Sequence, residues 1–162
     1  MRGRKRFLDR VKADIDALRS FPEGRDLLRR LDASGKRVTV RETMENDPEM
    51  DYDEETGHRR PDGRPGAGSD SSIKMFDGAD TDAGVIAPTA VTLGHELAHA
   101  VDAATGTMAT GHAWNPSPGE REQVEKSELD AVGLDYPGRI PLERPAENDL
   151  RRALLMPRRQ YY

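Results

Sequence analysis

The segment T-A-V-T-L-G-H-E-L-A-H-A-V-D-A-A-T-G, residues 89–106, decides the fold. It is rich in Ala, Leu and Val, Thr89 follows a proline, and Gly106 suits the left-handed residue that often ends a helix. These features predict a largely buried helix over the segment. The other elements are expected to pack around it.

Inside this helix, residues His95 to His99 have the pattern H-E-x-x-H. Residues four apart lie on one face of a helix, so the imidazoles of His95 and His99 can bind the same cation. Glu96 lies beside them, within reach of a metal-bound water. Buried polar groups without partners are costly, which favours a metal over two ordinary core histidines. The pattern predicts a zinc hydrolase with His95 and His99 as metal ligands and Glu96 as a catalytic residue.

A catalytic zinc usually has three protein ligands and one position open to water. The glycine and histidine that extend the motif in metzincins are missing here. The remaining candidates are His112 or a carboxylate in a helix predicted over residues 120–132: Glu120, Glu122, Glu125, Glu128 and Asp130. Glu128 shares a stripe of that helix with Val124, Ala131 and Val132, so its carboxylate is directed toward the core. We therefore predict Glu128 as the third ligand.

Composition narrows the class of protein. The chain has 162 residues, about one domain, and its net charge of −5 gives no electrostatic reason to expect a nucleic acid partner. Residues 1–10 are basic without the apolar core of a signal peptide, and no apolar stretch approaches the roughly 18 residues of a membrane span. Because there is no cysteine, any metal must be held by His and carboxylates. We expect a monomer that does not bind membranes.

The rest of the sequence predicts a small number of further elements. Apolar spacing indicates a helix over residues 7–18 that stops at residues 21–24, and a short second helix over residues 25–31. Strands are predicted over 38–40, 73–76 and 85–86. Residues 45–72 are acidic and then rich in Gly and Pro, with almost no apolar residue after Tyr52, so we expect a long flexible loop. The strand Ile73 to Phe76 could pair with substrate backbone by β-addition.

Several segments carry a family resemblance. They are a helical stretch over 16–28, the motif helix over 91–100, a Glu-containing segment over 128–134, and Glu-Asn-x-x-Arg-Arg over 147–152 followed by Pro-x-Arg-x-x-Tyr over 157–162. Together they resemble the NleD-type effector zinc metalloproteases, which bacterial pathogens and symbionts deliver and which also occur as toxin-like domains of larger proteins. Ser127 replaces a second Glu of many relatives, and Leu155-Met156 replaces a more usual Gly-Leu. Neither departure touches the predicted metal site.

The resemblance implies more site residues. It favours Glu128 as a ligand independently, and it makes Arg159 and Tyr162 the candidates for stabilising the oxyanion that develops during hydrolysis. A structural role, with the C-terminal segment forming a strand or cap, is the alternative for these two residues. The residue that orients a ligand imidazole is expected to be Asp102, or else Glu147 with Asn148.

The predicted protein is a single compact α+β domain over residues 1–162, zincin-like, with an H-E-x-x-H helix and a small antiparallel or mixed sheet. Its cofactor is Zn²⁺, and its reaction is endopeptidase cleavage by metal-activated water, with Glu96 taking the proton. The resemblance implies an effector or toxin that is cytoplasmic in the producer, is exported without a classical signal peptide, and cleaves a target-cell protein such as a host protein kinase. The alternatives are an intracellular regulatory metalloprotease and a non-enzymatic domain with a structural zinc.

Overall fold

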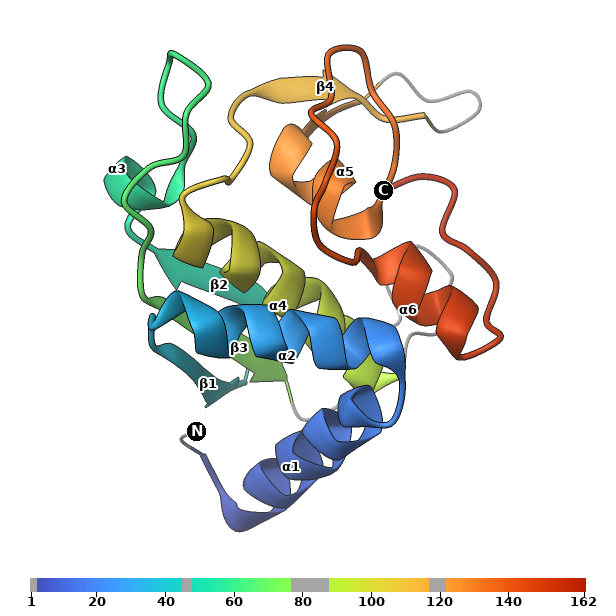
Figure 1. Ribbon diagram of the computed structural model, residues 1–162. Coiled ribbons are helices and arrows are strands. Elements are labelled where there is room, and N and C mark those ends of the chain that lie inside the picture. Colours follow the sequence, from blue (N-terminus) through green and yellow to red (C-terminus); the bar gives the residue numbers. More distant parts are fainter. Residues whose placement is uncertain (1–2, 45–47, 77–87, 117–121) are drawn as a thin grey trace.

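The computed structural model describes residues 3–44, 48–76, 88–116 and 122–162 (Figure 1). It confirms an α+β fold with two small sheets, one mixed and one antiparallel. The described helices are α1 (Lys5–Arg19), α2 (Pro22–Ser34), α3 (Glu54–Gly57), α4 (Thr89–Thr105), α5 (Lys126–Val132) and α6 (Glu147–Ala153). The strands are β1 (Val38–Thr43), β2 (Glu49–Tyr52), β3 (Ser71–Phe76), β4 (His112–Trp114) and β5 (Gln123–Glu125).

Helix α4 lies at the centre of the molecule, as predicted. Every residue from Ala90 to Ala104 is buried, and Gly106 ends the helix with a φ of 67°. In Figure 1, α2 crosses in front of α4 and the three-stranded sheet lies behind it. Leu93, Leu97 and Val101 of α4 belong to the main hydrophobic core. Because helices and sheet enclose α4, any polar side chain on it needs a partner inside the fold.

The three-stranded sheet has the order β1-β3-β2, with β1 parallel and β2 antiparallel to β3. Strand β3 is therefore central, and Ser71 to Lys74 have a paired strand on both sides. A substrate cannot pair there, so the prediction that substrate backbone adds to the strand Ile73 to Phe76 is wrong at Ile73 and Lys74. Among the residues that the structure describes, Met75 and Phe76 of β3 pair with β1 and with no residue of β2.

The segment over residues 45–72 contains regular structure, so the prediction of one long loop there is wrong for part of it. Strand β2 and helix α3 both lie within it. Met50 packs against the main core, Tyr52 hydrogen-bonds His58, and Asp53 caps α3 by accepting from the Glu55 backbone. The segment is ordered by contacts with distant residues, which its own composition does not reveal. Residues 45–47, and the strand predicted over 85–86, lie outside the described residues.

Two further helix predictions are corrected by the structure. Helix α1 matches the predicted helix over 7–18, but α2 begins at Pro22, because proline suits the first turn of a helix. The predicted helix over 120–132 is wrong over residues 122–125, while residues 120–121 lie outside the described residues. Residues Gln123–Glu125 form β5, which pairs antiparallel with β4, and the helix begins at Lys126. Val124 thus reaches a second core cluster from a strand rather than from a helix.

Helix α6 reaches α4 closely because Gly94 has no side chain. A Cβ at Gly94 would lie 2.2 Å from a methyl carbon of Leu150, which belongs to α6. This approach brings Glu147, at the start of α6, to the imidazole of His95. Among the helices in the described part of the chain, none has the length and apolar character needed to span a membrane.

Candidate metal centre

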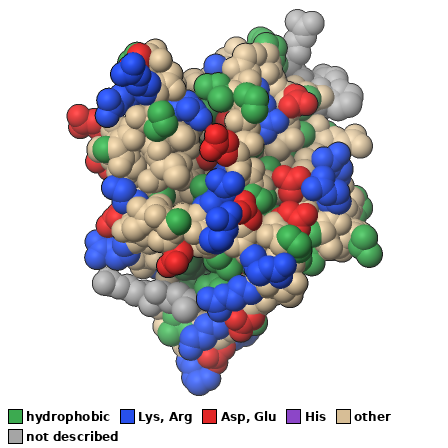
Figure 2. Space-filling view, viewed as in Figure 1, with side chains coloured by type: hydrophobic (Ala, Val, Ile, Leu, Met, Phe, Trp, Pro, Cys, Tyr) green, Lys and Arg blue, Asp and Glu red, His purple; other side chains and the backbone are tan. Residues whose placement is uncertain are grey.

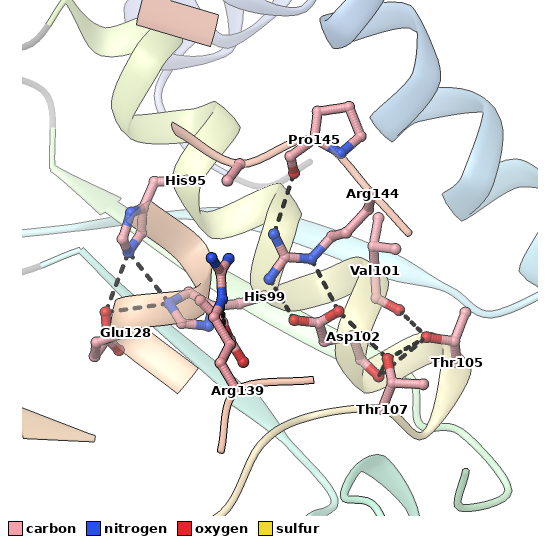
Figure 3. Close-up of polar contacts among 12 residues, drawn as sticks. His95, His99, Val101, Asp102, Thr105, Thr107, Glu128, Arg139, Arg144 and Pro145 are labelled. Atoms are coloured by element: carbon pink, nitrogen blue, oxygen red, sulfur yellow. Dashed lines mark hydrogen bonds and ion pairs between the residues drawn. The ribbon is translucent and has the colours of Figure 1, made fainter. Parts of the chain in front are cut away.

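Three side chains from two helices converge at one point. His95 and His99 project from the same face of α4, and Glu128 projects from α5 toward them (Figure 3). The Nε2 atoms of the two histidines are 3.2 Å apart, and each is 3.2 Å from Oε2 of Glu128. Within the described residues, this is the cluster of three ligand atoms that could hold a metal ion.

The spacing of the three atoms fits a small divalent ion. Bonds of about 2.0–2.1 Å in a tetrahedral site place the ligand atoms roughly 3.3–3.4 Å apart. The separations of 3.2 Å in the structure are close to that value. Two imidazoles and one carboxylate also form a donor set that binds divalent metal ions, zinc among them. Structural zinc sites have four protein ligands, whereas three converge here among the described residues, so an ion held by these three would have a position left for water.

The second ring nitrogen of His95 fixes the orientation of its imidazole. Nδ1 of His95 donates to Oε2 of Glu147 over 2.9 Å, inside the buried interface of α4 and α6. In a neutral ring this leaves Nε2 without a proton and with its lone pair facing the cluster. A carboxylate behind a ligand histidine is a common arrangement in zinc sites, where it holds the ring and raises its basicity.

The electrostatics of the cluster favour a cation. Burial lowers the pKa of His95, but the carboxylates of Glu128 and Glu147 outweigh burial and raise it to about 10. Burial raises the pKa of Glu128, but the two imidazoles outweigh burial and hold it far below its usual value. Without a metal ion, His95 therefore keeps its second proton, because the carboxylates of Glu128 and Glu147 stabilise the charged imidazole. A divalent cation would supply the positive charge that these groups demand.

Glu147 is itself held in place by a network of charges. Its Oε1 accepts from Nε of Arg151 over 2.5 Å, and Nη1 of Arg159 lies 3.5 Å from its Oε2. Burial raises the pKa of Glu147, but His95 and the two arginines outweigh it and lower the pKa to about 2. Glu147 is therefore ionised and positioned before any ligand binds. The alternative residue for this role, Asp102, makes no hydrogen bond with either histidine among the described residues and pairs with Arg144 instead.

Glu96 occupies the position that the motif predicts. It follows His95 on α4 and is 6% exposed. Its negative charge helps to raise the pKa of His95. A carboxylate this close to the cluster, and largely shielded from solvent, is suited to exchange protons with a water molecule there.

The C-terminal segment brings two more predicted residues to the cluster. The guanidinium of Arg159 lies 4.8 Å from the centre of the Tyr162 ring, and that ring lies 6.5 Å from the ring of His95. Burial and the Glu128 carboxylate, with which its hydroxyl interacts, raise the pKa of Tyr162 well above its usual value. The phenol therefore stays protonated and remains a hydrogen-bond donor beside the cluster.

Two buried asparagines hold this segment by its backbone. The side-chain amide of Asn148 donates to the Arg159 carbonyl over 2.8 Å and accepts from the Arg159 N–H over 2.7 Å. The amide of Asn115 does the same with Tyr162, over 2.5 Å and 3.0 Å. Each asparagine side chain makes the two backbone hydrogen bonds that a neighbouring strand would otherwise make, so the segment is held in place without being part of a sheet.

The other candidate ligands lie away from the cluster. Glu122, Glu125 and His112 are exposed, and His112 and Glu125 face each other across the β4–β5 pair. Asp130 accepts from Arg139 and Tyr136. Glu120 lies outside the described residues.

Some residues that shape the site were not predicted from the sequence. Asn115 is one, because its partner Tyr162 is 47 residues away and no local pattern marks the contact. Arg151 is another, although its i,i+4 spacing from Glu147 on a short helix was a usable signal. Arg144 lies in an irregular segment, where nothing indicates its burial.

The fold and this cluster define a metallopeptidase of the zincin type. In agreement, the family Peptidase_M91, described as effector protein, matches residues 1–162 of the sequence. The chain belongs to this family of metalloprotease effectors, which confirms the resemblance seen in the sequence. Membership implies a metal ion at the active centre and proteins as substrates. Among curated proteins, none matches the chain at a significant level.

Proposed function

We propose that the protein is a zinc endopeptidase in which His95, His99 and Glu128 hold the ion and Glu96 is the general base. The observation that carries this proposal is the convergence of two imidazole nitrogens and one carboxylate oxygen, each 3.2 Å from the others. A zinc ion bound there would acidify a water molecule and polarise the scissile carbonyl.

The side chains around the cluster have separate roles in the proposed reaction. Glu96 accepts a proton from the attacking water and passes it to the leaving amine, a role typically worth 100- to 10,000-fold in rate. Glu147 keeps His95 in the tautomer whose Nε2 faces the ion. The phenol of Tyr162 and the guanidinium of Arg159 donate to the oxyanion as it forms. This role requires the asparagine contacts, since a free segment would not present its donors in a fixed position.

The proposed substrates are proteins of a cell into which the chain is delivered. The description of the family as effector proteins supports delivery. The family resemblance names a protein kinase of the target cell as the first substrate to test. One copy of the chain supplies all proposed catalytic and metal-binding groups, which supports a monomer as the active unit.

The test is cleavage by the zinc-loaded chain in a lysate of candidate target cells, read as new protein N-termini by mass spectrometry. The wild type should generate a defined set of new termini, and Glu96→Gln should reduce their rate of formation by 100-fold or more. Glu96→Gln should also keep one equivalent of zinc and the wild-type circular dichroism spectrum.

A matched control is Glu122→Gln, which makes the same change at an exposed carboxylate outside the cluster and should cleave like the wild type. Wild-type rates of cleavage by Glu96→Gln would contradict the proposed general base. A lysate without new termini in the presence of the loaded wild type would contradict the proposed activity.

A further inference from the structure

A pocket lies along α4, next to the metal cluster. It is a cavity of about 840 Å³, and Asp102 and Thr105 of α4 form part of its wall. Asp102 comes three residues after His99, which is about 4.5 Å along a helix. The opposite walls are the loop over residues 58–65 and the segment over 136–144. Lys126 and Asp130, which flank Glu128 on α5, also line it. We call it the basic cavity, for the charges described next.

Part of the charge around the basic cavity is neutralised within the fold. Arg144 pairs with Asp102, Arg139 pairs with Asp130, and Arg30 pairs with Asp26. These pairs fix the walls and leave little net charge. They do not account for every charged residue that lines the cavity.

Four charged lining residues have no ion pair within the described part of the chain: Arg59, Arg60, Lys126 and Glu143. Their sum is two positive charges, in a chain whose net charge is −5. Arg60 is exposed, and Lys126 is half-buried with its ammonium 5.9 Å from the ring of Tyr136. Figure 2 shows Lys and Arg side chains at this end of the surface, over the loop that follows α3. The cavity is therefore locally positive on an acidic protein.

The basic cavity also has an apolar side. Val101, Pro61 and Leu142 line it, and Ile140 lines it with 47% of its surface exposed. A cavity with apolar walls and a few fixed charges is the usual form of a ligand site. Apolar side chains beside unpaired cations suit a peptide better than a small inorganic anion, which has no apolar part to bury.

We propose that the basic cavity binds an acidic segment of the protein substrate, a few residues from the bond that is cleaved. This inference rests on the proposed function. An extended chain advances about 3.3 Å per residue, so a peptide that crosses the metal cluster reaches the cavity within a few residues. Carboxylates of that segment pair with Arg60 and Lys126, while neighbouring apolar side chains contact Ile140. The cavity thereby selects acidic sequences on one side of the scissile bond.

The first experiment measures binding without catalysis. Fluorescence anisotropy follows a fluorescein-labelled hexaglutamate peptide titrated with the full chain carrying Glu96→Gln. Adding Arg60→Glu and Lys126→Glu should weaken binding about tenfold, because two attractive pairs become repulsive. Replacing the same residues by Gln should weaken binding less. Added salt should reduce these differences, since the groups are accessible to solvent.

The control reverses two exposed charges far from the cavity. Lys12→Glu with Arg19→Glu makes the same change in net charge on α1, which Figure 1 shows at the other end of the molecule. It should leave binding within twofold of the parent. Equal weakening by the control and by the cavity variant would overturn the proposal, because the effect would then be one of net charge alone.

The second experiment reads the cleavage pattern in a peptide library derived from a whole proteome. The zinc-loaded wild type should show enrichment of Asp and Glu on one side of the cleaved bond. The variant with Arg60→Glu and Lys126→Glu should lose that enrichment, and the α1 control should keep it. Wild-type cleavage that depends on Glu96 but shows no acidic enrichment would overturn the cavity's role and leave the peptidase standing. If no cleavage depended on Glu96, both the cavity's role and the proposed peptidase activity would be contradicted.

Discussion

Two neighbouring sets of buried polar groups on helix α4 have partners of opposite charge. His95 and His99 face a carboxylate, so that three electron-pair donors point at one another (Figure 3). Asp102, one turn further along the same face, accepts from Nε of Arg144 over 2.9 Å and also pairs with its Nη2. The first group needs a cation from outside the chain, and the second already has one.

Burial of charge alone therefore does not mark a functional site in this protein. His95, His99 and Asp102 are between 5% and 7% exposed, and all three lie on the same helix. What separates them is the sign of the group that faces them. A cluster of bases without a fixed cation points to a ligand, whereas a base matched by a guanidinium points to structure.

The largest effect is expected from removing the imidazoles. The double substitution His95→Ala and His99→Ala should abolish peptide cleavage and reduce bound zinc from one equivalent to none, measured by inductively coupled plasma mass spectrometry. Removing zinc from the wild type with a chelator should abolish cleavage as well, and added zinc should restore it. The contrast would fail if the double variant retained a full equivalent of zinc at the wild-type affinity.

The next effect concerns the C-terminal segment. Tyr162→Phe keeps the backbone contacts with Asn115 but removes the phenolic donor, so kcat should fall by roughly 100- to 1,000-fold, the usual cost of an oxyanion donor. Asn115→Leu loosens the segment and should reduce kcat by a smaller factor. Bound zinc should stay at one equivalent in both. Unchanged kcat in Tyr162→Phe would assign the segment a purely structural role.

A smaller effect is expected from changing Glu147, which accepts the hydrogen bond from Nδ1 of His95. Glu147→Gln removes the charged acceptor of the His95 Nδ1 proton, and such a change typically lowers metal affinity 10- to 100-fold. Competition with a fluorescent zinc chelator measures the affinity. Asp149→Asn, on the more exposed side of the same helix, serves as the control and should bind zinc like the wild type. Equal affinities in Glu147→Gln and the control would show that this contact does not support the metal site.

The smallest effect on the metal site is expected from the Asp102–Arg144 pair. Asp102→Asn leaves a buried guanidinium without its counter-charge and should lower the free energy of unfolding by about 3–5 kcal/mol, measured in urea. Replacing both residues, by Asp102→Leu and Arg144→Met, should restore much of that stability. Zinc affinity of the folded protein should remain at the wild-type value in each variant. A tenfold loss of zinc affinity would show that the Asp102–Arg144 pair and the metal cluster form one functional unit.

The sequence predicted the centre of this fold better than its periphery. Helix α4 was predictable because a segment rich in Ala, Leu and Val carried His95 and His99 four residues apart and ended at Gly106, and these signals are local. Glu128 was predicted as a ligand on a stripe that included Val124, although Val124 lies in β5. The structure nevertheless places Glu128 beside the two histidines, because Ala131 and Val132, which follow it, are helical and buried as expected.

The features that the sequence did not reveal depend on distant partners. Strand β2 forms in an acidic segment because Met50 packs against the core and because the strand pairs with the edge of β3. The side chain of Asn115 binds the backbone of Tyr162, and the guanidinium of Arg144 pairs with Asp102, which lies 42 residues earlier. Contacts of this kind follow from tertiary structure, and no periodicity or motif encodes them.

The metal site is tested most directly by a crystal structure of the zinc-loaded chain, with anomalous data collected on both sides of the zinc absorption edge. We predict one strong anomalous peak, bonded to Nε2 of His95, Nε2 of His99 and a carboxylate oxygen of Glu128. We also predict that the His95–Glu147 hydrogen bond and the Asp102–Arg144 pair are both retained. No peak at the cluster, or a peak held by other residues, would contradict it.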